Sequence, residues 1–116
     1  MNLQVGRFEY GEEQMLVDVF GNKKIVKVLD FLLDDLLSQF TKTDIAKGSI
    51  VSRTSASKIV SYLVEIGMLK GTKKSGKTTW FRLNTSSPLV TSLIKLDNEI
   101  SNVFANMNVV GDFDAV

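Results

Sequence analysis

The chain has 116 residues, a net charge of +1, and neither cysteine nor histidine. This length suits one domain with a single hydrophobic core. The composition excludes disulfides, thiolate nucleophiles, Cys/His zinc sites and imidazole catalysis. The acidic pairs Glu12-Glu13 and Asp34-Asp35 are adjacent, so their carboxylates diverge on a helix. We therefore expect no enzyme, no cofactor and no metal site.

The charge is distributed unevenly along the chain. Residues 1–39 and residues 85–116 each carry a net charge of −3, whereas residues 40–84 hold nine basic and two acidic side chains, a net charge of +7. A basic segment attracts phosphate backbones, although a solvated lysine surface has the same composition. The acidic flanks are expected to form the scaffold and to face away from such a partner.

The N-terminal segment lacks the features of an export signal. Residues 1–11 have neither a basic start nor an apolar run, and a signal peptide needs both. No stretch approaches the ~20 apolar residues of a membrane span. We expect a soluble, cytoplasmic protein that does not contact membranes. Residues 11–20 could form a short helix, whose apolar side would be Met15, Leu16, Val19 and Phe20.

A stronger helical pattern follows the break at Gly21 and Asn22. It extends from Lys23 to Leu36, and its apolar residues recur at the spacing of one helix face. They are Ile25, Val28, Leu29, Leu32, Leu33 and Leu36. Phe40-Thr41 is compatible with a short strand. We expect Thr43 to cap a second helix, which Gly48 should end early.

A third helix is expected from the cap Ser52 to Ile66, with a stop at Gly67. Its apolar face comprises Ala56, Ile59, Val60, Leu63 and Ile66, and its opposite face comprises Thr54, Ser57, Lys58 and Ser61. Serine and threonine are weak choices for an exposed helix face. The polar face therefore suits close contact with a partner rich in hydrogen-bonding groups, and plain solvent exposure is the simpler alternative.

A hairpin with a basic tip follows. Met68–Lys70 begins one strand, Ser75-Gly76 marks a two-residue turn, and Thr78–Leu83 returns. Lys73, Lys74 and Lys77 crowd the tip. These lysines could protect the strand edges from pairing, or they could form a basic finger that contacts a partner.

The last helix begins at Ser87 and Pro88, a favourable cap and first position. Its apolar residues follow the spacing of a seam between two helices. They are Leu89, Leu93, Leu96, Ile100 and Val103. We expect these residues to form a homodimer interface, and the alternative is packing on the helix's own domain.

The order of elements, α-β-α-α-β-β-α, predicts a mainly α protein with a small β-hairpin. Two short helices joined by a tight turn form a helix-turn-helix, and the hairpin after them makes it a winged helix. The expected organisation is an N-terminal extension at 1–20, a winged helix-turn-helix domain at 21–84, a dimerisation helix at 85–105 and a flexible acidic tail at 106–116.

Three stretches resemble archaeal winged helix-turn-helix transcription regulators of the MarR/ArsR type. The first is Phe20-Gly21-Asn22 with the helix that follows it. The second is TKTDIAKGSIVSRTSASKIVSYLVEIGMLK, from Thr41 to Lys70, and the third is WFRLNTSSPLVTSLIKL, from Trp80 to Leu96. The resemblance covers Phe20 to Ile100. It indicates the fold specifically and says nothing of the regulated gene.

The resemblance implies a sequence-selective regulator that binds double-stranded DNA as a homodimer. The third helix would lie in the major groove, with Ser52, Arg53, Thr54, Ser55, Ser57, Lys58 and Ser61. The second helix would contact phosphates with Lys42 and Thr43. The wing would contact the flanking backbone or minor groove with Lys73, Lys74, Ser75, Gly76 and Lys77.

The family often has an aromatic residue or an arginine near the middle of the face that reads DNA. This chain departs from that pattern, with Lys58 between Ser57 and Ser61, and Arg53 is the only arginine of the third helix. Arginine is the usual bidentate reader of guanine, so part of the selectivity is expected to come from DNA shape. Because a fold does not fix a function, a protein-interaction adaptor within a larger complex is the alternative function. The sequence leaves the target site, the direction of regulation and any small-molecule effector open.

Overall fold

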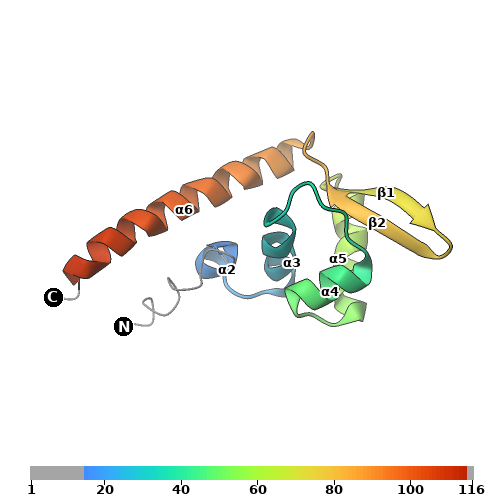
Figure 1. The fold of residues 1–116 in the computed structure, drawn as a ribbon, viewed down its shortest axis with the longest axis horizontal. Coiled ribbons are helices and arrows are strands. Elements are labelled where there is room, and N and C mark those ends of the chain that lie inside the picture. The colour runs from blue at the N-terminus through green and yellow to red at the C-terminus, as the bar shows by residue number, and fades with distance from the viewer. Residues whose placement is uncertain (1–14, 115–116) are drawn as a thin grey trace.

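The computed structural model describes residues 15–114, in which a helical body carries a two-stranded hairpin at one end and a long helix along one side (Figure 1). The elements in chain order are α2 (Met15–Phe20), α3 (Lys24–Leu33), α4 (Lys42–Ser49), α5 (Arg53–Glu65), β1 (Leu69–Ser75), β2 (Thr78–Leu83) and α6 (Pro88–Asp114). The predicted winged helix-turn-helix is confirmed. Residues 1–14, most of the predicted N-terminal extension, lie outside the described residues.

The hairpin β1–β2 is antiparallel, with Leu69 opposite Leu83 and Ser75 opposite Thr78. Its two-residue turn is therefore Gly76-Lys77, one residue later than the Ser75-Gly76 turn that the sequence suggested. Gly76 has a φ of 61°, a conformation that glycine adopts without steric cost. The expected short strand at Phe40 is present as a single antiparallel bridge to Phe81, which attaches the segment before α4 to the hairpin.

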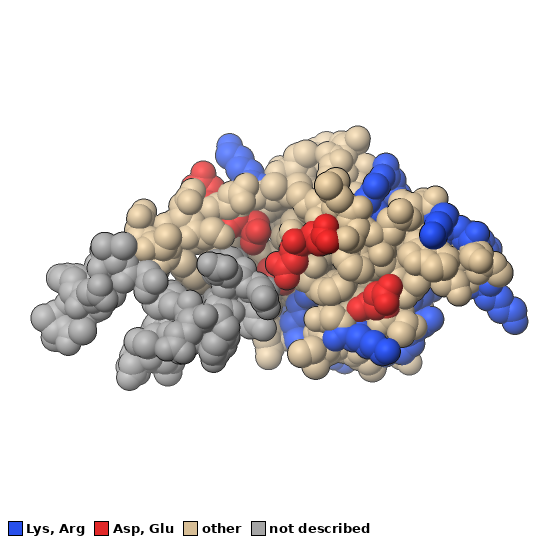
Figure 2. Space-filling view, in the orientation of Figure 1, with Lys and Arg blue, Asp and Glu red and all other residues tan. Residues whose placement is uncertain are grey.

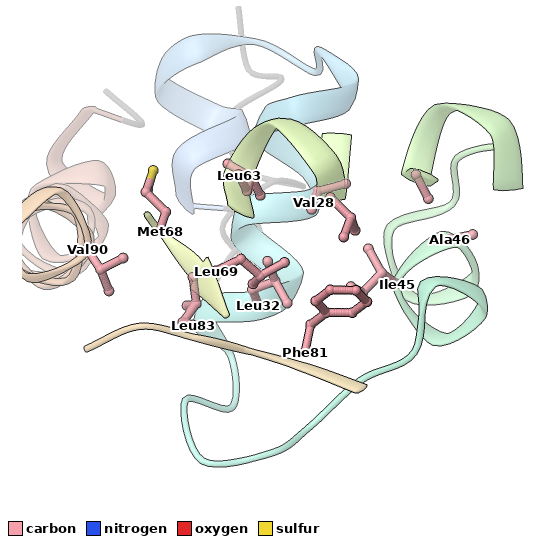
Figure 3. Packing of buried hydrophobic residues seen from close by; sticks show 12 residues of the cluster. Val28, Leu32, Ile45, Ala46, Leu63, Met68, Leu69, Phe81, Leu83 and Val90 are labelled. Atoms are coloured by element: carbon pink, nitrogen blue, oxygen red, sulfur yellow. The ribbon is translucent and has the colours of Figure 1, made fainter. Parts of the chain in front are cut away.

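The main core lies where α3, α4 and α5 meet the base of the hairpin (Figure 3). Val28 and Leu32 face it from α3, and Ile45 faces it from α4. The remaining buried members are Ala46, Ala56, Val60, Leu63, Met68, Leu69, Phe81, Leu83 and Val90. Removal of these side chains from water is the main force that holds the helix-turn-helix on the wing.

A second, smaller cluster joins α2 to α6. Leu16 of α2 and Ile100 of α6 are both buried in it, and Leu29, Leu33 and Phe104 pack around them. Asp30 of α3, only 5% exposed, completes the attachment. Its carboxylate oxygens accept hydrogen bonds from the backbone N–H groups of Leu16 (3.1 Å) and Val17 (2.9 Å).

The helix α3 ends at Leu33, three residues before the predicted end at Leu36. The cause is local, because the Asp35 side chain accepts hydrogen bonds from Leu37 N and Ser38 Oγ. An aspartate that bonds to its own following backbone favours a turn over a continued helix. Leu36 still packs on the main core from the turn.

The helix α6 continues to Asp114, beyond the predicted end at residue 105 and through most of the segment expected to be a flexible tail. Extension of an existing helix needs no new nucleus, and no proline interrupts this segment. The far end of α6 projects away from the wing (Figure 1).

Candidate nucleic-acid interface

The first helix of the helix-turn-helix, α4, begins with a reciprocal cap at Thr41. The Thr41 hydroxyl accepts a hydrogen bond from Asp44 N (3.1 Å), and the Asp44 carboxylate accepts one from Thr41 N (2.9 Å). The expectation that Thr43 caps this helix is wrong, because the cap lies two residues earlier. Thr43 instead lies exposed in the first turn, where its hydroxyl is available to other partners.

The tight turn of the motif begins after Ser49, one residue beyond the predicted helix stop at Gly48. The helix α4 continues through Gly48 to Ser49, and Ile50 adopts a left-handed conformation with a φ of 58°. The predicted helix stop at Gly48 is wrong, because this glycine lies inside the helix and leaves room for the ring of Phe31. A Cβ on Gly48 would lie 2.1 Å from Cε1 of Phe31, so the ring occupies the space that a side chain would need.

The helix α5 is capped by Ser52, as predicted, and the Ser52 hydroxyl accepts a hydrogen bond from Ser55 N (3.0 Å). Thr54, Lys58 and Ser61 are exposed and form the outward face. Ser55 and Ser57 are half-buried. At 100° per residue they lie on opposite flanks of the outward face.

Three cations donate hydrogen bonds to hydroxyl groups around the start of α5. Lys24 Nζ donates to Ser55 Oγ (3.1 Å), and Lys42 Nζ donates to Ser57 Oγ (3.2 Å). Arg53 Nε donates to Thr43 Oγ1 (3.1 Å). In each pair the partner of the cation is neutral, so its positive charge is not compensated there.

The wing presents lysines from a hairpin that is tied to the body. The Lys73 ammonium lies 4.7 Å from the centre of the Trp80 ring, within the range of a cation–π interaction. The Thr72 hydroxyl bonds to Gln39 and to the carbonyl of Trp80. Lys74 and Lys77 extend from the exposed tip, where Ser75 and Gly76 are also exposed.

A cleft of about 330 Å³ lies between the start of α4, the start of α5 and the wing. It is lined by Thr41, Lys42, Thr43, Arg53, Lys77, Thr78, Thr79 and Phe81. Three of these side chains are cations and four are threonines, and no carboxylate is among the described residues that line it. The cleft can bind an anion with several oxygen atoms, for which the cations and hydroxyls supply donors.

Basic side chains are concentrated near the wing and along one edge of the helical body (Figure 2). Two lysines of the acidic N-terminal flank lie beside the helix-turn-helix. Lys24 and Lys27, counted in that flank, reach Ser55 and the carbonyl of Ile50 respectively. The helix α3 therefore adds positive charge beside the helix-turn-helix.

The structure brings four of the predicted DNA-contacting residues together in the cleft, namely Lys42, Thr43, Arg53 and Lys77. Thr54, Lys58 and Ser61 lie outside it on the outward face of α5. Two side chains at this surface were not predicted. Lys24 gives no signal in the sequence because packing alone brings α3 beside α5, and Tyr62, 51% exposed, was assigned to neither face of its helix.

The predicted interface stripe on α6 divides into two parts. Ile100 is 7% exposed and packs on Leu16, and Leu93 is half-buried against both clusters. Leu89 (53% exposed), Leu96 (38%) and Val103 (52%) lie in solvent at intervals of seven residues. Residues seven apart share one helix face.

Asp97 of α6 is half-buried, and this burial raises the pKa of its carboxyl above the ordinary value.

Within residues 15–114, no group of three acidic, cysteine or histidine side chains could hold a metal ion. No helix in the same residues is both long and apolar enough to cross a bilayer.

Comparison with known proteins identifies the fold through structure rather than through sequence. No protein-family model matches the chain. No curated protein matches it either.

Several solved structures have the same fold. MepR, a transcription regulator of the Staphylococcus aureus multidrug efflux pump MepA, aligns with a TM-score of 0.60 and 17% identity over 97% of this chain and 78% of its own. A MarR family transcriptional regulator from Silicibacter pomeroyi aligns with a TM-score of 0.55 and 16% identity over 95% of this chain and 84% of its own. Sso10a-2, a DNA-binding protein from Sulfolobus solfataricus, aligns with a TM-score of 0.51 and 17% identity over 75% of this chain and 92% of its own.

Proposed function

We propose that this chain is a DNA-binding transcription regulator that acts as a homodimer and selects double-stranded sites by sequence. The observation that carries the proposal is the cleft between α4, α5 and the wing, where Lys42, Arg53 and Lys77 meet without an acidic neighbour among the described lining residues. A phosphodiester backbone is the anion that such an extended basic surface suits. Similarly folded proteins that are named as transcription regulators or as DNA-binding support the same function.

In this proposal the cleft binds the backbone and α5 enters the major groove. Lys42 and Thr43 contact a phosphate at the start of α4, and Lys77 brings the wing to the same strand. Phosphate contacts of this kind fix the register of the protein on the duplex. Base edges are then met by the outward face of α5, where Thr54, Lys58 and Ser61 are exposed, and by Arg53 and Ser57 beside it.

The exposed stripe on α6 supports the proposed homodimer. Leu89, Leu96 and Val103 leave apolar area in solvent along one face of a 27-residue helix. Pairing with the same stripe of a second copy would bury this area. Two recognition helices in such a dimer would enter successive major grooves, about 34 Å apart, on a palindromic site.

The decisive experiment measures binding of the whole chain to labelled duplexes of random sequence at low salt. Trp80, the single tryptophan, lies in the wing and supplies an intrinsic fluorescence signal. We expect binding that weakens steeply as salt rises. A variant with Lys42→Ala, Arg53→Ala and Lys77→Ala should bind at least tenfold more weakly, with a shallower salt dependence.

A matched variant controls for net charge, with Lys47→Ala, Lys70→Ala and Lys95→Ala, all exposed and outside the cleft. It should retain more affinity than the cleft variant. Equal losses in the two variants would show that the cleft has no special role. If the unmodified chain binds no duplex at low salt, DNA binding is wrong and the protein-interaction adaptor becomes the better interpretation.

A further inference from the structure

The pair formed by Lys24 and Ser55 lies outside the cleft. Lys24 is the first residue of α3 and is exposed, and its ammonium donates to Ser55 Oγ at 3.1 Å. Ser55 belongs to the first turn of α5, and the two residues are 31 positions apart in the sequence. Packing of α3 against α5 therefore places a cation beside the start of the recognition helix.

This pair and the pair at the cleft occupy opposite flanks of α5. Ser55 and Ser57 are two residues apart, so their side chains point about 200° from one another around the helix axis. Lys42, which lines the cleft, donates to Ser57 at 3.2 Å. The outward face of α5, with Thr54 and Lys58, lies between two cation–hydroxyl pairs.

The chemistry of the Lys24–Ser55 pair suits an acceptor that carries negative charge. An ammonium group can only donate, so the Ser55 oxygen accepts and its hydroxyl hydrogen remains available to a further acceptor. Two N–H groups of Lys24 also remain. Because Ser55 is neutral, the charge of Lys24 is not cancelled by this partner. The first turn of α3 contains no acidic side chain.

We propose that Lys24 and Ser55 form a second phosphate-binding site for the DNA backbone, on the flank of the recognition helix opposite the cleft. The duplex is then held by backbone contacts on both sides of α5, which fixes the depth and tilt of the helix in the groove. This inference rests on the proposed function.

Lys27 has a different role although it lies one helical turn after Lys24. Its ammonium donates to the carbonyl of Ile50 at 3.3 Å, and the side chain is half-buried in a hollow that Asp30 and Asp34 also line. The two carboxylates lower the local positive potential. We therefore assign the new phosphate site to Lys24 and a supporting role at the turn to Lys27.

The test compares Lys24→Ala with Lys95→Ala, an exposed lysine of α6, by titration of a labelled random duplex at several salt concentrations. Loss of one phosphate contact per copy should weaken binding severalfold for every sequence and make the slope of log K against log salt shallower by about 1 for each bound copy. Lys95→Ala should change neither quantity. Lys24→Arg, which keeps the charge, should retain the slope of the unmodified chain.

Three outcomes separate this inference from the function on which it rests. The new site is overturned if Lys24→Ala keeps the salt dependence of the unmodified chain while the cleft variant binds DNA more weakly. DNA binding itself would then remain supported. Absence of all duplex binding overturns both. A reduced slope that Lys24→Arg restores supports the new site, and urea unfolding of each variant confirms that the compared proteins are folded.

Discussion

The ring of Phe31 lies against the backbone of Gly48, in the space where any side chain at position 48 would begin. A Cβ there would be 2.1 Å from Cε1 and 2.4 Å from Cδ1 of the ring. Phe31 is itself held by Phe40, with the two ring centres 4.7 Å apart. The helices α3 and α4 therefore approach each other as closely as a glycine permits.

We predict that Gly48→Ala destabilises the protein despite the better helix propensity of alanine. In a helix interior, alanine is more stabilising than glycine by up to about 1 kcal/mol. Displacement of the packed Phe31 ring would destabilise the folded state by about 1–3 kcal/mol. Urea unfolding should therefore show a lower midpoint. Lys47→Ala, at the exposed neighbouring position, should stay within about 0.5 kcal/mol of the unmodified chain. A more stable Gly48→Ala variant would show that the ring moves freely.

Asp30→Asn should detach α2 from the body. The carboxylate accepts from two backbone N–H groups, whereas the amide that replaces it offers one oxygen and an opposing NH₂ group. Loss of a buried hydrogen bond to a charged group costs about 1.5–3 kcal/mol. The check is thermal unfolding together with hydrogen exchange at Leu16 and Val17. Glu99→Gln, on the exposed side of α6, serves as the control, and equal stability of the two variants would contradict the prediction.

Substitution on α6 should separate association from folding. Leu96→Lys and Val103→Lys replace exposed side chains, so we expect folded chains with the mass of a monomer, 12.9 kDa. Ile100→Lys puts a charge into the buried contact with Leu16 and should destabilise the fold itself. Light scattering after size exclusion measures the mass, and circular dichroism measures folding. A folded dimer of Leu96→Lys would exclude this stripe as the interface.

Asp97 should give the protein a measurable dependence of stability on pH. Burial raises the pKa of this carboxyl, so the folded state binds the proton more tightly than the unfolded state does. Its contribution to stability therefore decreases as pH rises from the unfolded pKa through the folded one, and the ionised form remains a cost at neutral pH. Asp97→Asn should raise the melting temperature at pH 7 and change it less at pH 3. An equal change at both pH values would contradict this assignment.

The wing lysines should contribute affinity without selectivity. Replacement of Lys73, Lys74 and Lys77 by alanine should weaken binding to all duplexes and flatten the salt dependence, because phosphate contacts carry no sequence information. Lys73→Ala alone should also change the fluorescence of Trp80, over which the ammonium lies. Unchanged affinity and salt slope in the triple variant would mean that the wing is not a DNA-binding element.

The fold was predictable because its signals are local. The apolar spacing of α3, the Ser52 cap and the glycine turn of the hairpin each depend on neighbours in the sequence. The error at Gly48 arose where tertiary packing outweighs local preference. Gly48 is typical of a helix end, but it is required inside α4 by the ring of Phe31, and the turn is left to Ile50.

The candidate site was only partly predictable for a related reason. Lys42, Thr43, Arg53 and Lys77 were each predicted to contact DNA, but from three different elements, and only the structure shows that they line one cleft. Lys24 belongs to a segment with a negative net charge, and only the packing of α3 beside α5 brings it to Ser55. The net charge of each segment therefore identified residues 40–84 as the basic region, but it did not reveal that Lys24 lies at the same surface.

The contact between Leu16 and Ile100 has a consequence for the geometry of an assembled regulator. It is the buried link through which α2 connects the body to α6. In the proposed dimer, α6 carries the symmetry axis and α5 carries the selectivity, so the angle set at this contact determines how far apart the two recognition helices stand. A substitution that repacks Leu16 would then alter the preferred number of base pairs between half-sites, although the residue itself is remote from any nucleotide.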